Sequence, residues 1–389
     1  MVGIDRFSTL PPELILPIFE HNRDQSGREK TISLIAKPFL HAQRSELYRI
    51  VRLYDLDQFI RFSETIRSVN ALGPMVKELH MVFWTGETDD GSWMPKWAED
   101  GEQITRSMFP HLTSLRMLRV TSPVMSRIFL DLATQNVLTL TTLITLDLRL
   151  NNDCDALAQS ILAVFPQLHF LDLDFDPDLP LSPTNLTTAS ILPLDPPKLL
   201  DALTLRGNLL DSSLSNIVSS TEARCVLLEG VDVDTAVKSL RNSNSEHMKE
   251  LALHPTFPTM ILDRHLLQLN HIAHLTLNDF VNLGPTFFTD YFPSCSLQSL
   301  NLLPRFELKA ADLIQACQKK PASLKTLVID VLGDSESMDE CRWKELMWTR
   351  DCTVSLMRQL ISVYRLAGVK VQGSVNKAVR VGSEWAEYQ

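Results

Sequence analysis

Leucine residues recur along the chain in short runs in which apolar and polar positions alternate. The pattern is L-x-x-L-x-L, in which Ile, Val or Met sometimes replaces Leu, and a clear example is Leu115-x-x-Leu118-x-Val120. Because consecutive side chains of a β-strand point to opposite faces, the last two apolar residues of each run would enter a core and the residue between them would face outward. Each run therefore predicts a short strand. The middle apolar residue of successive runs lies at positions 118, 146, 171, 203, 226, 251, 275, 300 and 327, and weaker runs flank them at Leu79-x-Met81 and Val369-x-Val371.

The segments between the predicted strands contain amphipathic helices. Residues 153–165 begin with a helix-capping Asp and place Leu157, Ile161 and Val164 on one face, and residues 309–317 behave similarly. A strand and a helix that return about every 26 residues are typical of leucine-rich repeats. We therefore predict an α/β leucine-rich-repeat solenoid, a right-handed horseshoe with its strands on the concave side, of about ten degenerate repeats over residues 76–389.

Two segments interrupt the spacing and are predicted to be insertions. Residues 83–104 are acidic, and residues 174–198 are rich in proline, which explains the longest gap between strands. Long loops on a compact scaffold are often functional or disordered. Exposed tryptophans are good anchors for a partner, although packing of the loop on the first repeats would also explain them. The candidate loop anchors are Trp84, Trp93 and Trp97.

The first fifty residues differ from the repeats and predict three short helices. Thr9, followed by Pro11 and Pro12 with Glu13 in the first turn, is a plausible helix start. A module of about 45 residues is too small for an independent core, so it is expected to complete its core on a neighbour or on a partner chain. Residues 51–75 are predicted to form a helical connector between this module and the repeats.

The helical module carries a resemblance to a known family. Leu10-Pro11-Pro12-Glu13-Leu14-Ile15 with Ile18-Phe19, then Ser33-Leu34-Ile35, Phe39 and Leu47-Tyr48, resembles an F-box over residues 5–50. With the repeats that follow, the chain is similar to fungal F-box/leucine-rich-repeat proteins. It departs from the family in the middle helix, where Ala36-Lys37-Pro38-Phe39 replaces the frequent cysteine, basic and aromatic residues, and Pro38 would end that helix early.

The resemblance implies that the chain is the substrate-recognition subunit of an SCF-type (Skp–cullin–F-box) ubiquitin ligase. The F-box would bind a Skp-family adaptor, which connects to the cullin–RING ligase, and the repeats would capture a protein substrate. Two alternatives stay open: the helices only cap the exposed end of the solenoid, or the chain is a ubiquitin-independent protein-binding scaffold. The residues implied to contact the adaptor are Leu10, Pro11, Glu13, Leu14, Ile15, Ile18, Leu34 and Phe39.

The outward strand positions form a candidate substrate face whose character changes along the chain. We hypothesise that its charged first half selects a polar or charged segment of the partner, whereas a solvated face without a binding role would have the same composition. The charged positions are Arg119, Asp147, Arg149, Asp172, Asp174, Arg206 and Glu229. The nearly neutral positions that follow are Ala252, Thr276, Asn278, Asn301, Leu303 and Val328.

Composition and charge agree with this picture. The chain has 389 residues, too many for one hydrophobic core, with 63 leucines and only 13 glycines. Its net charge of −10 gives no electrostatic footprint for nucleic acid. Six cysteines without a C-x-x-C pair indicate buried thiols in a reducing compartment. Without a secretory signal or an apolar run long enough to span a membrane, we expect a cytoplasmic or nuclear protein.

Candidate catalytic chemistry is missing from the sequence. It contains no G-x-x-x-x-G-K-[ST], G-x-S-x-G or H-E-x-x-H motif. His265, His271 and His274 cluster, but no carboxylate or cysteine stands at ligand spacing, which favours a structural role over a metal site. We therefore expect a non-catalytic protein that needs no cofactor or metal.

Overall fold

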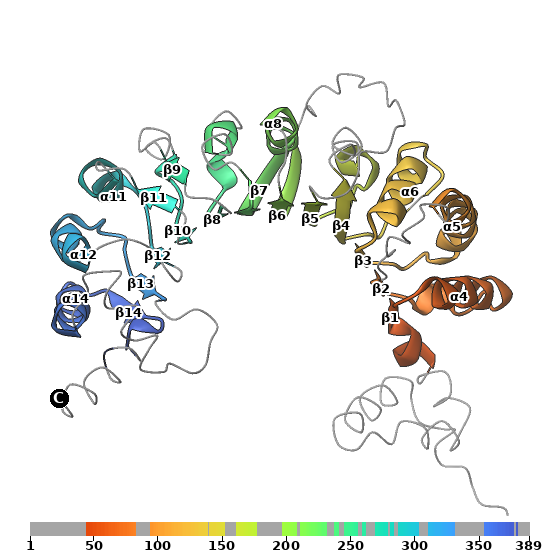
Figure 1. The fold of residues 1–389 in the computed structure, drawn as a ribbon, viewed down its shortest axis with the longest axis horizontal. Coiled ribbons are helices and arrows are strands. Elements are labelled where there is room, and N and C mark those ends of the chain that lie inside the picture. Colours follow the sequence, from red (N-terminus) through yellow and green to blue (C-terminus); the bar gives the residue numbers. More distant parts are fainter. Residues whose placement is uncertain are drawn as a thin grey trace, which may run out of the picture. The chain divides into compact units, whose positions relative to one another are not determined.

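The computed structural model describes most of the chain beyond the N-terminal module. The chain divides into two compact units, residues 1–150 with 160–168 (unit 1) and residues 151–159 with 169–389 (unit 2). Figure 1 shows the described elements with their labels. The described residues are 44–82, 94–138, 140–151, 161–176, 197–207, 211–231, 237–240, 245–255, 259–261, 269–278, 281–283, 287–302, 310–330, 354–376 and 379.

Unit 1 is built on parallel strands that follow one another in chain order. The strands are β1 (Ile50–Leu53), β2 (Glu78–Met81), β3 (Met117–Val120) and β4 (Thr145–Asn151). The pairing aligns Leu79 with Leu118, and Leu118 with Leu146. All three leucines are fully buried. The register therefore places the central leucine of each run in a single buried row.

The helices of unit 1 cover one side of these strands (Figure 1). Helix α4 (Leu56–Ser68) starts where Asp55 accepts a hydrogen bond from the backbone N–H of Gln58 at 2.7 Å, and it buries Phe59 and Phe62. Helix α6 (Pro123–Thr134) starts at Ser122, with Pro123 in its first turn. Its Phe129 stacks on Phe165 at 5.8 Å between ring centroids. The core thus lies between the strands and this helical layer. Short 3₁₀ turns at η1 (Gly73–Met75) and η2 (Phe109–His111) lead into β2 and β3.

The prediction of an insertion at residues 83–104 is wrong for the second half of that segment. Residues Met94–Met108 form helix α5, which belongs to the same helical layer and packs against α4 and α6. The buried residues of its C-terminal half are Gly101, Thr105 and Met108, which share a face at i, i+4 and i+7. Small residues let α5 approach α6 closely, because a Cβ on Gly101 would lie 3.1 Å from Met125 Sδ. Such a face contains no leucine, so the leucine pattern of the sequence does not reveal it.

The strand ladder begins earlier than the sequence pattern indicates. The segment 51–75, predicted as a helical connector, contains α4, but it opens within β1, which pairs parallel to β2 with Val51 opposite Leu79. Strand β1 has four residues and only Leu53 is fully buried in it, so it lacks the repeated leucines that identify the later strands.

Unit 2 repeats the same arrangement over a longer parallel ladder. Leu171, Leu203 and Val226 are aligned by the register, and the row continues through Leu251, Leu275, Leu300, Leu327 and Val371. All nine predicted strands and both flanking runs are therefore confirmed as strands in the two ladders. The strands of unit 2, in sheet order, are β5 (Phe170–Asp176), β6 (Lys198–Gly207), β7 (Thr221–Glu229), β8 (Glu250–His254), β10 (His274–Leu277), β12 (Ser299–Leu302), β13 (Thr326–Ile329) and β14 (Lys370–Gln372).

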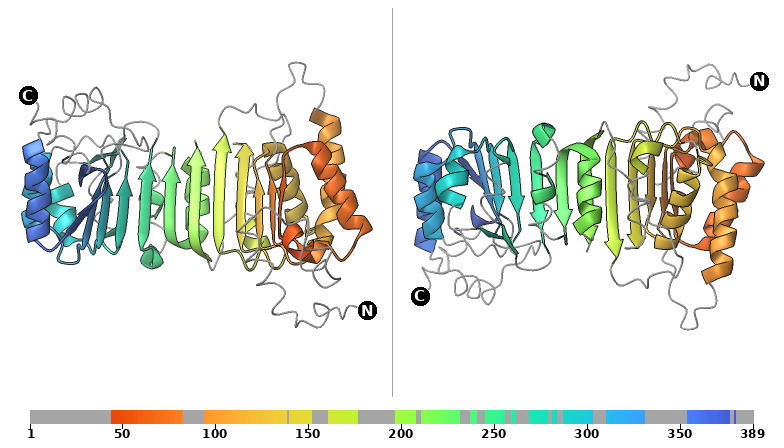
Figure 2. Two further views of the ribbon diagram at one scale, coloured as in Figure 1. Left: turned by 90° about the horizontal axis from the view of Figure 1, so that it is seen from below. Right: turned by 90° about the horizontal axis from the view of Figure 1, so that it is seen from above.

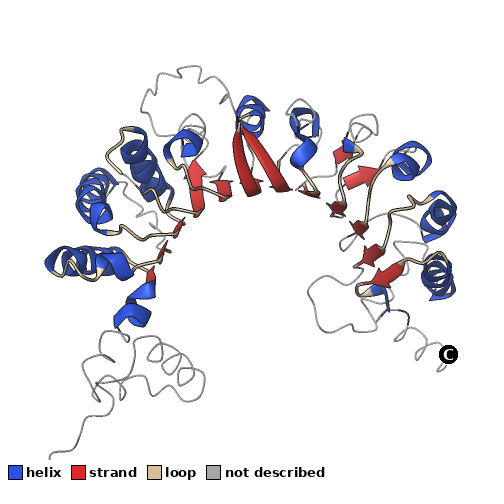
Figure 3. Ribbon diagram, turned by 180° about the vertical axis from the view of Figure 1, so that it is seen from behind, coloured by secondary structure: helices blue, strands red, loops and turns tan. Residues whose placement is uncertain are grey.

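Helices again cover one side of the strands of unit 2, as Figures 2 and 3 show. The predicted helix at 309–317 is confirmed as α12 (Ala310–Ala316), and Tyr364 of α14 (Val354–Leu366) donates a hydrogen bond to the carbonyl of Leu313 in α12 at 3.0 Å. Of the predicted helix at 153–165, residues 161–164, which belong to unit 1, are described and helical, and Leu157 lies outside the described part. The helices are α8 (Asp211–Ser219), the π-helix η6 (Phe287–Tyr291) continuing into α11 (Phe292–Ser294), α12 (Ala310–Ala316) and α14 (Val354–Leu366), with 3₁₀ turns η4 (Ser245–His247) and η7 (Cys317–Lys319). Strands β9 (Thr259–Ile261) and β11 (Val281–Leu283) form a separate parallel pair. In the chain, β9 follows β8 and β11 follows β10.

No described helix is long and apolar enough to cross a membrane. Taken separately, each unit is a repeat-like α/β solenoid, with a parallel ladder on one side and helices on the other.

Because β5 and β6 approach each other closely, we expect any substitution of Gly207 to destabilise the fold. Gly207 has φ of +90°, and a Cβ there would lie 1.9 Å from the carbonyl oxygen of Phe175. Gly368, after α14, has φ of +79° and open space around it. We expect Gly368→Ala to cost roughly 1–2 kcal/mol through backbone strain alone, and Gly207→Ala to cost more because two strands must separate. Denaturant midpoints of the two variants test this, and equal midpoints would contradict it.

Candidate protein-binding face

The side of the strands opposite the helices carries a row of charged residues in unit 1. Arg52 of β1, His80 of β2, Arg119 of β3 and Asp147 of β4 are aligned by the strand register. Arg119 Nε lies 3.0 Å from Asp147 Oδ2. Two of the predicted face residues therefore form an ion pair, and the structure adds Arg52 and His80 to their row. Arg149, the next outward position of β4, is half-buried.

Burial and neighbouring cations act together on His80. Its pKa is lowered mainly by desolvation, then by the charge of Arg52, with a smaller effect of Arg119 in the same direction. Glu78 opposes this shift, with its Oε2 3.7 Å from His80 Nε2. A lowered pKa keeps the imidazole neutral at pH 7. An anion bound beside it would raise that pKa.

Sequence reasoning missed Arg52 and His80 for different reasons. His80 is the middle residue of the weak run Leu79-x-Met81, and its alternation was the signal that could have placed it on the face. Arg52 lies in a strand without a recognisable leucine run, so only its pairing with β2 places it there.

In unit 2, one arginine joins three strands. Arg206 of β6 places Nη2 3.2 Å from Asp172 Oδ2 on β5 and Nε 3.1 Å from Glu229 Oε2 on β7. Asp174 is aligned with Arg206, and Glu229 is aligned with His254 of β8. Burial lowers the pKa of His254, and the charge of Glu229 opposes that effect. These residues form an acidic group organised around a single cation.

Further along unit 2 the face becomes neutral, as the sequence predicts. Asn301 donates a hydrogen bond to Thr276 Oγ1 at 3.0 Å and accepts one from Ser299 at 2.9 Å. Asn278 donates to the carbonyl of Pro255 at 3.2 Å. Ala252 and Val328 are half-buried outward positions of β8 and β13, and Leu303 lies outside the described residues. The side-chain amides of Asn278 and Asn301 thus have hydrogen-bond partners within unit 2.

The other candidate residues fall largely outside the described chain. This holds for all eight residues implied to contact the adaptor, for His265 and for the side chains of the three loop tryptophans. His271 and His274 are half-buried, and Nε2 of His271 is buried without a hydrogen-bond partner. Among the described residues, no group of three or more His, Cys, Asp or Glu could hold a metal ion. Cys225, Cys295 and Cys317 are free thiols, and burial raises the pKa of each.

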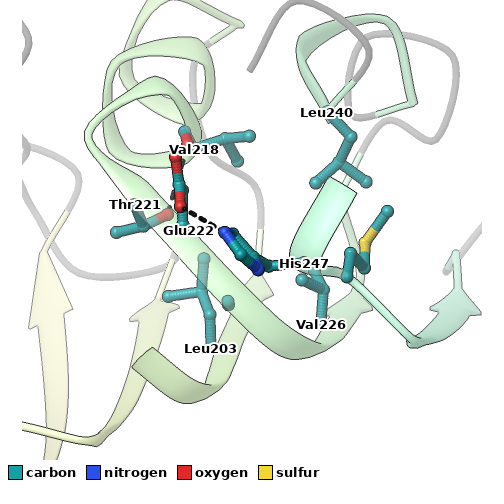
Figure 4. A pocket seen from close by; sticks show the side chains of 9 residues that line it. Leu203, Val218, Thr221, Glu222, Val226, Leu240 and His247 are labelled. Carbon is teal, nitrogen blue, oxygen red and sulfur yellow. Dashed lines mark hydrogen bonds and ion pairs between the residues drawn. The ribbon is translucent and has the colours of Figure 1, made fainter. Parts of the chain in front are cut away.

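A small pocket lies on the helical side of β6 and β7 (Figure 4). His247 Nε2 and Glu222 Oε2 lie 3.5 Å apart at its edge, and the rest of the lining is mostly apolar. Its volume is about 10 Å³, which is room for about one water molecule. Small-molecule sites are usually hundreds of cubic ångströms in size. This pocket therefore cannot hold a substrate, and the strand face is the better candidate site.

Comparison with known proteins gives only a distant similarity. Neither a family model nor a curated protein matches the sequence. Among solved structures, a chain of the crystal structure of the Rad7 and Elc1 complex in yeast is similar over 87% of this chain and 86% of its own length. The sequence identity is 13% and the TM-score is 0.37. At this level no function is transferred, and functional reasoning rests on the residues of this chain.

The bridge made by Arg206 should stabilise unit 2 measurably. Exposed ion pairs contribute about 0.2–1 kcal/mol each, and Arg206→Ala also leaves Asp172, Asp174 and Glu229 in mutual repulsion. We expect a small loss of stability that shrinks in about 1 M salt, where such charges are screened. A double-mutant cycle of Arg206→Ala and Glu229→Ala in chemical denaturation measures the coupling. A coupling energy of zero at low salt would contradict a stabilising bridge.

Proposed function

We propose that this chain is the substrate receptor of an SCF-type ubiquitin ligase. In this proposal, residues 5–50, which resemble an F-box, bind a Skp-family adaptor. The strand faces of the two units bind a protein substrate. The chain itself supplies no catalytic group. It acts by holding the substrate near the recruited conjugating machinery, so that a bimolecular reaction becomes effectively intramolecular.

The observation that carries the substrate-binding part is the strand face itself. In both units the outward positions of parallel strands are held in register and no described helix lies over them. Such a surface is rigid and extended, as in repeat proteins that bind other proteins. Exposed charges on each face, such as Arg119 on β3 of unit 1 and Glu229 on β7 of unit 2, can discriminate between partners.

The adaptor-binding part is supported by the sequence motif. A helical cap over the first repeat needs apolar residues, but it does not require Leu10-Pro11 followed by Glu13. A ubiquitin-independent scaffold would use the same strand faces without an adaptor. The two functions therefore differ in one property, which is binding of the adaptor.

Adaptor binding can be measured directly with the full chain and a purified Skp-family adaptor. We expect a stable complex on size-exclusion chromatography, and we expect its loss in the Leu10→Ala, Pro11→Ala, Leu14→Ala variant because these apolar residues would form the contact. A matched control replaces exposed leucines of unit 2, Leu199 and Leu366, by alanine. The control should bind like the unchanged chain.

Circular dichroism and thermal unfolding of both variants establish that the repeats remain folded. If the unchanged chain forms no complex at tens of micromolar adaptor, the ligase function is contradicted and the scaffold function takes its place. Retained binding in the triple variant would contradict the assignment of the contact to these residues.

A further inference from the structure

Strand β1 has a hydrogen-bonded neighbour on one side. It is the first strand of its ladder, and among the described strands it pairs with β2 alone (Figure 1). The carbonyl of Arg49 accepts a hydrogen bond from the N–H of Lys77 at 3.0 Å, and the carbonyl of Leu53 accepts one from the N–H of Val82 at 2.8 Å. The odd-numbered residues of β1 therefore direct their backbone groups toward β2.

The other side of β1, which we call its outer edge, carries backbone groups that are not paired. Backbone groups of successive strand residues point in opposite directions, so the carbonyl of Ile50 and both backbone groups of Arg52 point away from β2. Neither residue makes a hydrogen bond to the described chain outside the β1–β2 ladder. The next N–H on this side, that of Tyr54, is bonded to Gln58 Oε1 at 3.0 Å. Within the described chain, the outer edge thus offers one donor and two acceptors.

The last strand of unit 2 is closed on its corresponding side. The N–H of Lys370 donates to the carbonyl of Lys325 at 2.8 Å, just before β13, so Val371 directs its backbone groups to the far side of β14. There the carbonyl of Val371 accepts a hydrogen bond from Asn376 Nδ2 at 3.2 Å. An edge capped in this way resists pairing with another chain. The open edge of β1 is therefore not shared by both end strands.

The apolar side chains of β1 are also incompletely covered. Val51 is half-buried, although it is aligned with Leu79, which is fully buried between its two neighbouring strands. A strand at the outer edge would place an apolar residue beside Val51, as β2 does on the other side. Leu47, in the helical residues directly before β1, is 67% exposed. The chemistry that completes this end of the ladder is therefore an extended backbone with alternating apolar residues.

We propose that the outer edge of β1 binds an extended segment of a protein partner, which joins the ladder as a further parallel strand with two apolar residues at alternate positions. The N–H of the first apolar residue donates to the carbonyl of Ile50, and its carbonyl accepts from the N–H of Arg52. The N–H of the second apolar residue donates to the carbonyl of Arg52. The two apolar side chains lie beside Val51 and Leu53. The inference rests on the proposed function as a receptor for protein substrates and names the conformation and pattern of the captured segment.

A second copy of the chain fits this edge less well than a segment of another protein. Two copies joined through this edge would be related by a two-fold axis, so their β1 strands would run antiparallel. Pairings that keep all bonds within β1 bring the exposed Arg52 of one copy opposite, or diagonal to, Arg52 of the other. Like charges at such positions are destabilising. The helical module at the start of the chain is assigned to the adaptor in the proposed function.

The probe for this edge is a labelled peptide that copies residues 75–82, Met-Val-Lys-Glu-Leu-His-Met-Val. In the ladder, the carbonyls of Lys77 and Met81 accept hydrogen bonds from the N–H groups of Met117 and Thr121. The peptide would pair with β1 as β2 pairs with β3, through its leucine and its second methionine. We expect it to bind the full chain in fluorescence anisotropy. The same peptide with aspartate at those two positions should not bind.

Methylation of single peptide amides tests the hydrogen-bond pattern. We expect N-methylation of the leucine or of the second methionine to weaken binding by about tenfold or more, because an N–H that donates to β1 is lost and a methyl group is inserted between the strands. N-methylation of the histidine between them is the matched control, since that N–H points away from β1, and it should have little effect. The opposite pattern would mean antiparallel addition or displacement of β2, and it would contradict the inference.

Two variants of Arg52 test the edge from the side of the protein. Arg52→Pro removes the N–H on the outer edge and leaves the bonds to β2 intact, and proline is accepted in edge strands. It should weaken peptide binding by about tenfold or more. Arg52→Ala keeps this N–H and should bind within about twofold of the unchanged chain, since the side chain makes no required contact. Circular dichroism and thermal unfolding establish that both variants remain folded.

Several outcomes would overturn the inference. These are no binding of the peptide at about 1 mM, and equal affinities of Arg52→Pro and Arg52→Ala. A concentration-dependent dimer of the unchanged chain that Arg52→Pro abolishes would assign the edge to a second copy instead. Adaptor binding is measured on the same samples. A chain that binds the peptide but not the adaptor keeps the strand-binding edge and loses the ligase function, and the reverse result does the opposite.

Discussion

The parallel register of the buried leucine row is the constraint on which the rest of each unit depends. Strands such as β2, β10 and β13 have only four residues and cannot be stable alone. They are held because Leu79, Leu275 and Leu327 each stack on the equivalent residue of the next strand and are fully buried. Full burial of one such side chain contributes roughly 1.5–3 kcal/mol. A shift of one residue would turn every one of these side chains toward solvent.

The same register decides the chemistry of the outward face. Once the leucines are aligned, the residues between them are aligned as well, and charges from different repeats meet on neighbouring strands. Arg206 can reach both Asp172 and Glu229 only because β5, β6 and β7 are parallel and in step. The close backbone approach at Gly207 has the same origin. Ion pairs on the face are therefore a consequence of the core.

The two units present different surfaces, although both are built from a parallel ladder of strands with helices on one side. In unit 1 the row of Arg52, His80, Arg119 and Asp147 carries charges of both signs, with Arg119 paired to Asp147, and lies beside exposed Tyr54 and Val82. In unit 2 the acidic residues around Arg206 give way to a neutral row of Thr276 and Asn301 that satisfies itself by hydrogen bonds. A receptor with surfaces of unlike charge can select a partner by pattern as well as by shape. The proposed role in a ubiquitin ligase needs this selectivity, because the chain itself would contribute recognition only.

The sequence by itself determined the strands and their inner and outer faces, because the two-residue alternation of L-x-L survives in every repeat from Leu115 to Ile329. It also determined which residues the charged face contains from Arg119 onward. Only the tertiary structure decided that Met94–Met108 is a helix and that Ile50–Leu53 is the first strand. Helix α5 packs through Gly101 and Thr105, whose small side chains carry no hydrophobic signal, and β1 is identified only by its pairing with β2. The placement of Arg52 and His80 beside Arg119 escaped the sequence for the same physical reason, since these residues come from segments far apart in the chain that only the sheet register brings together.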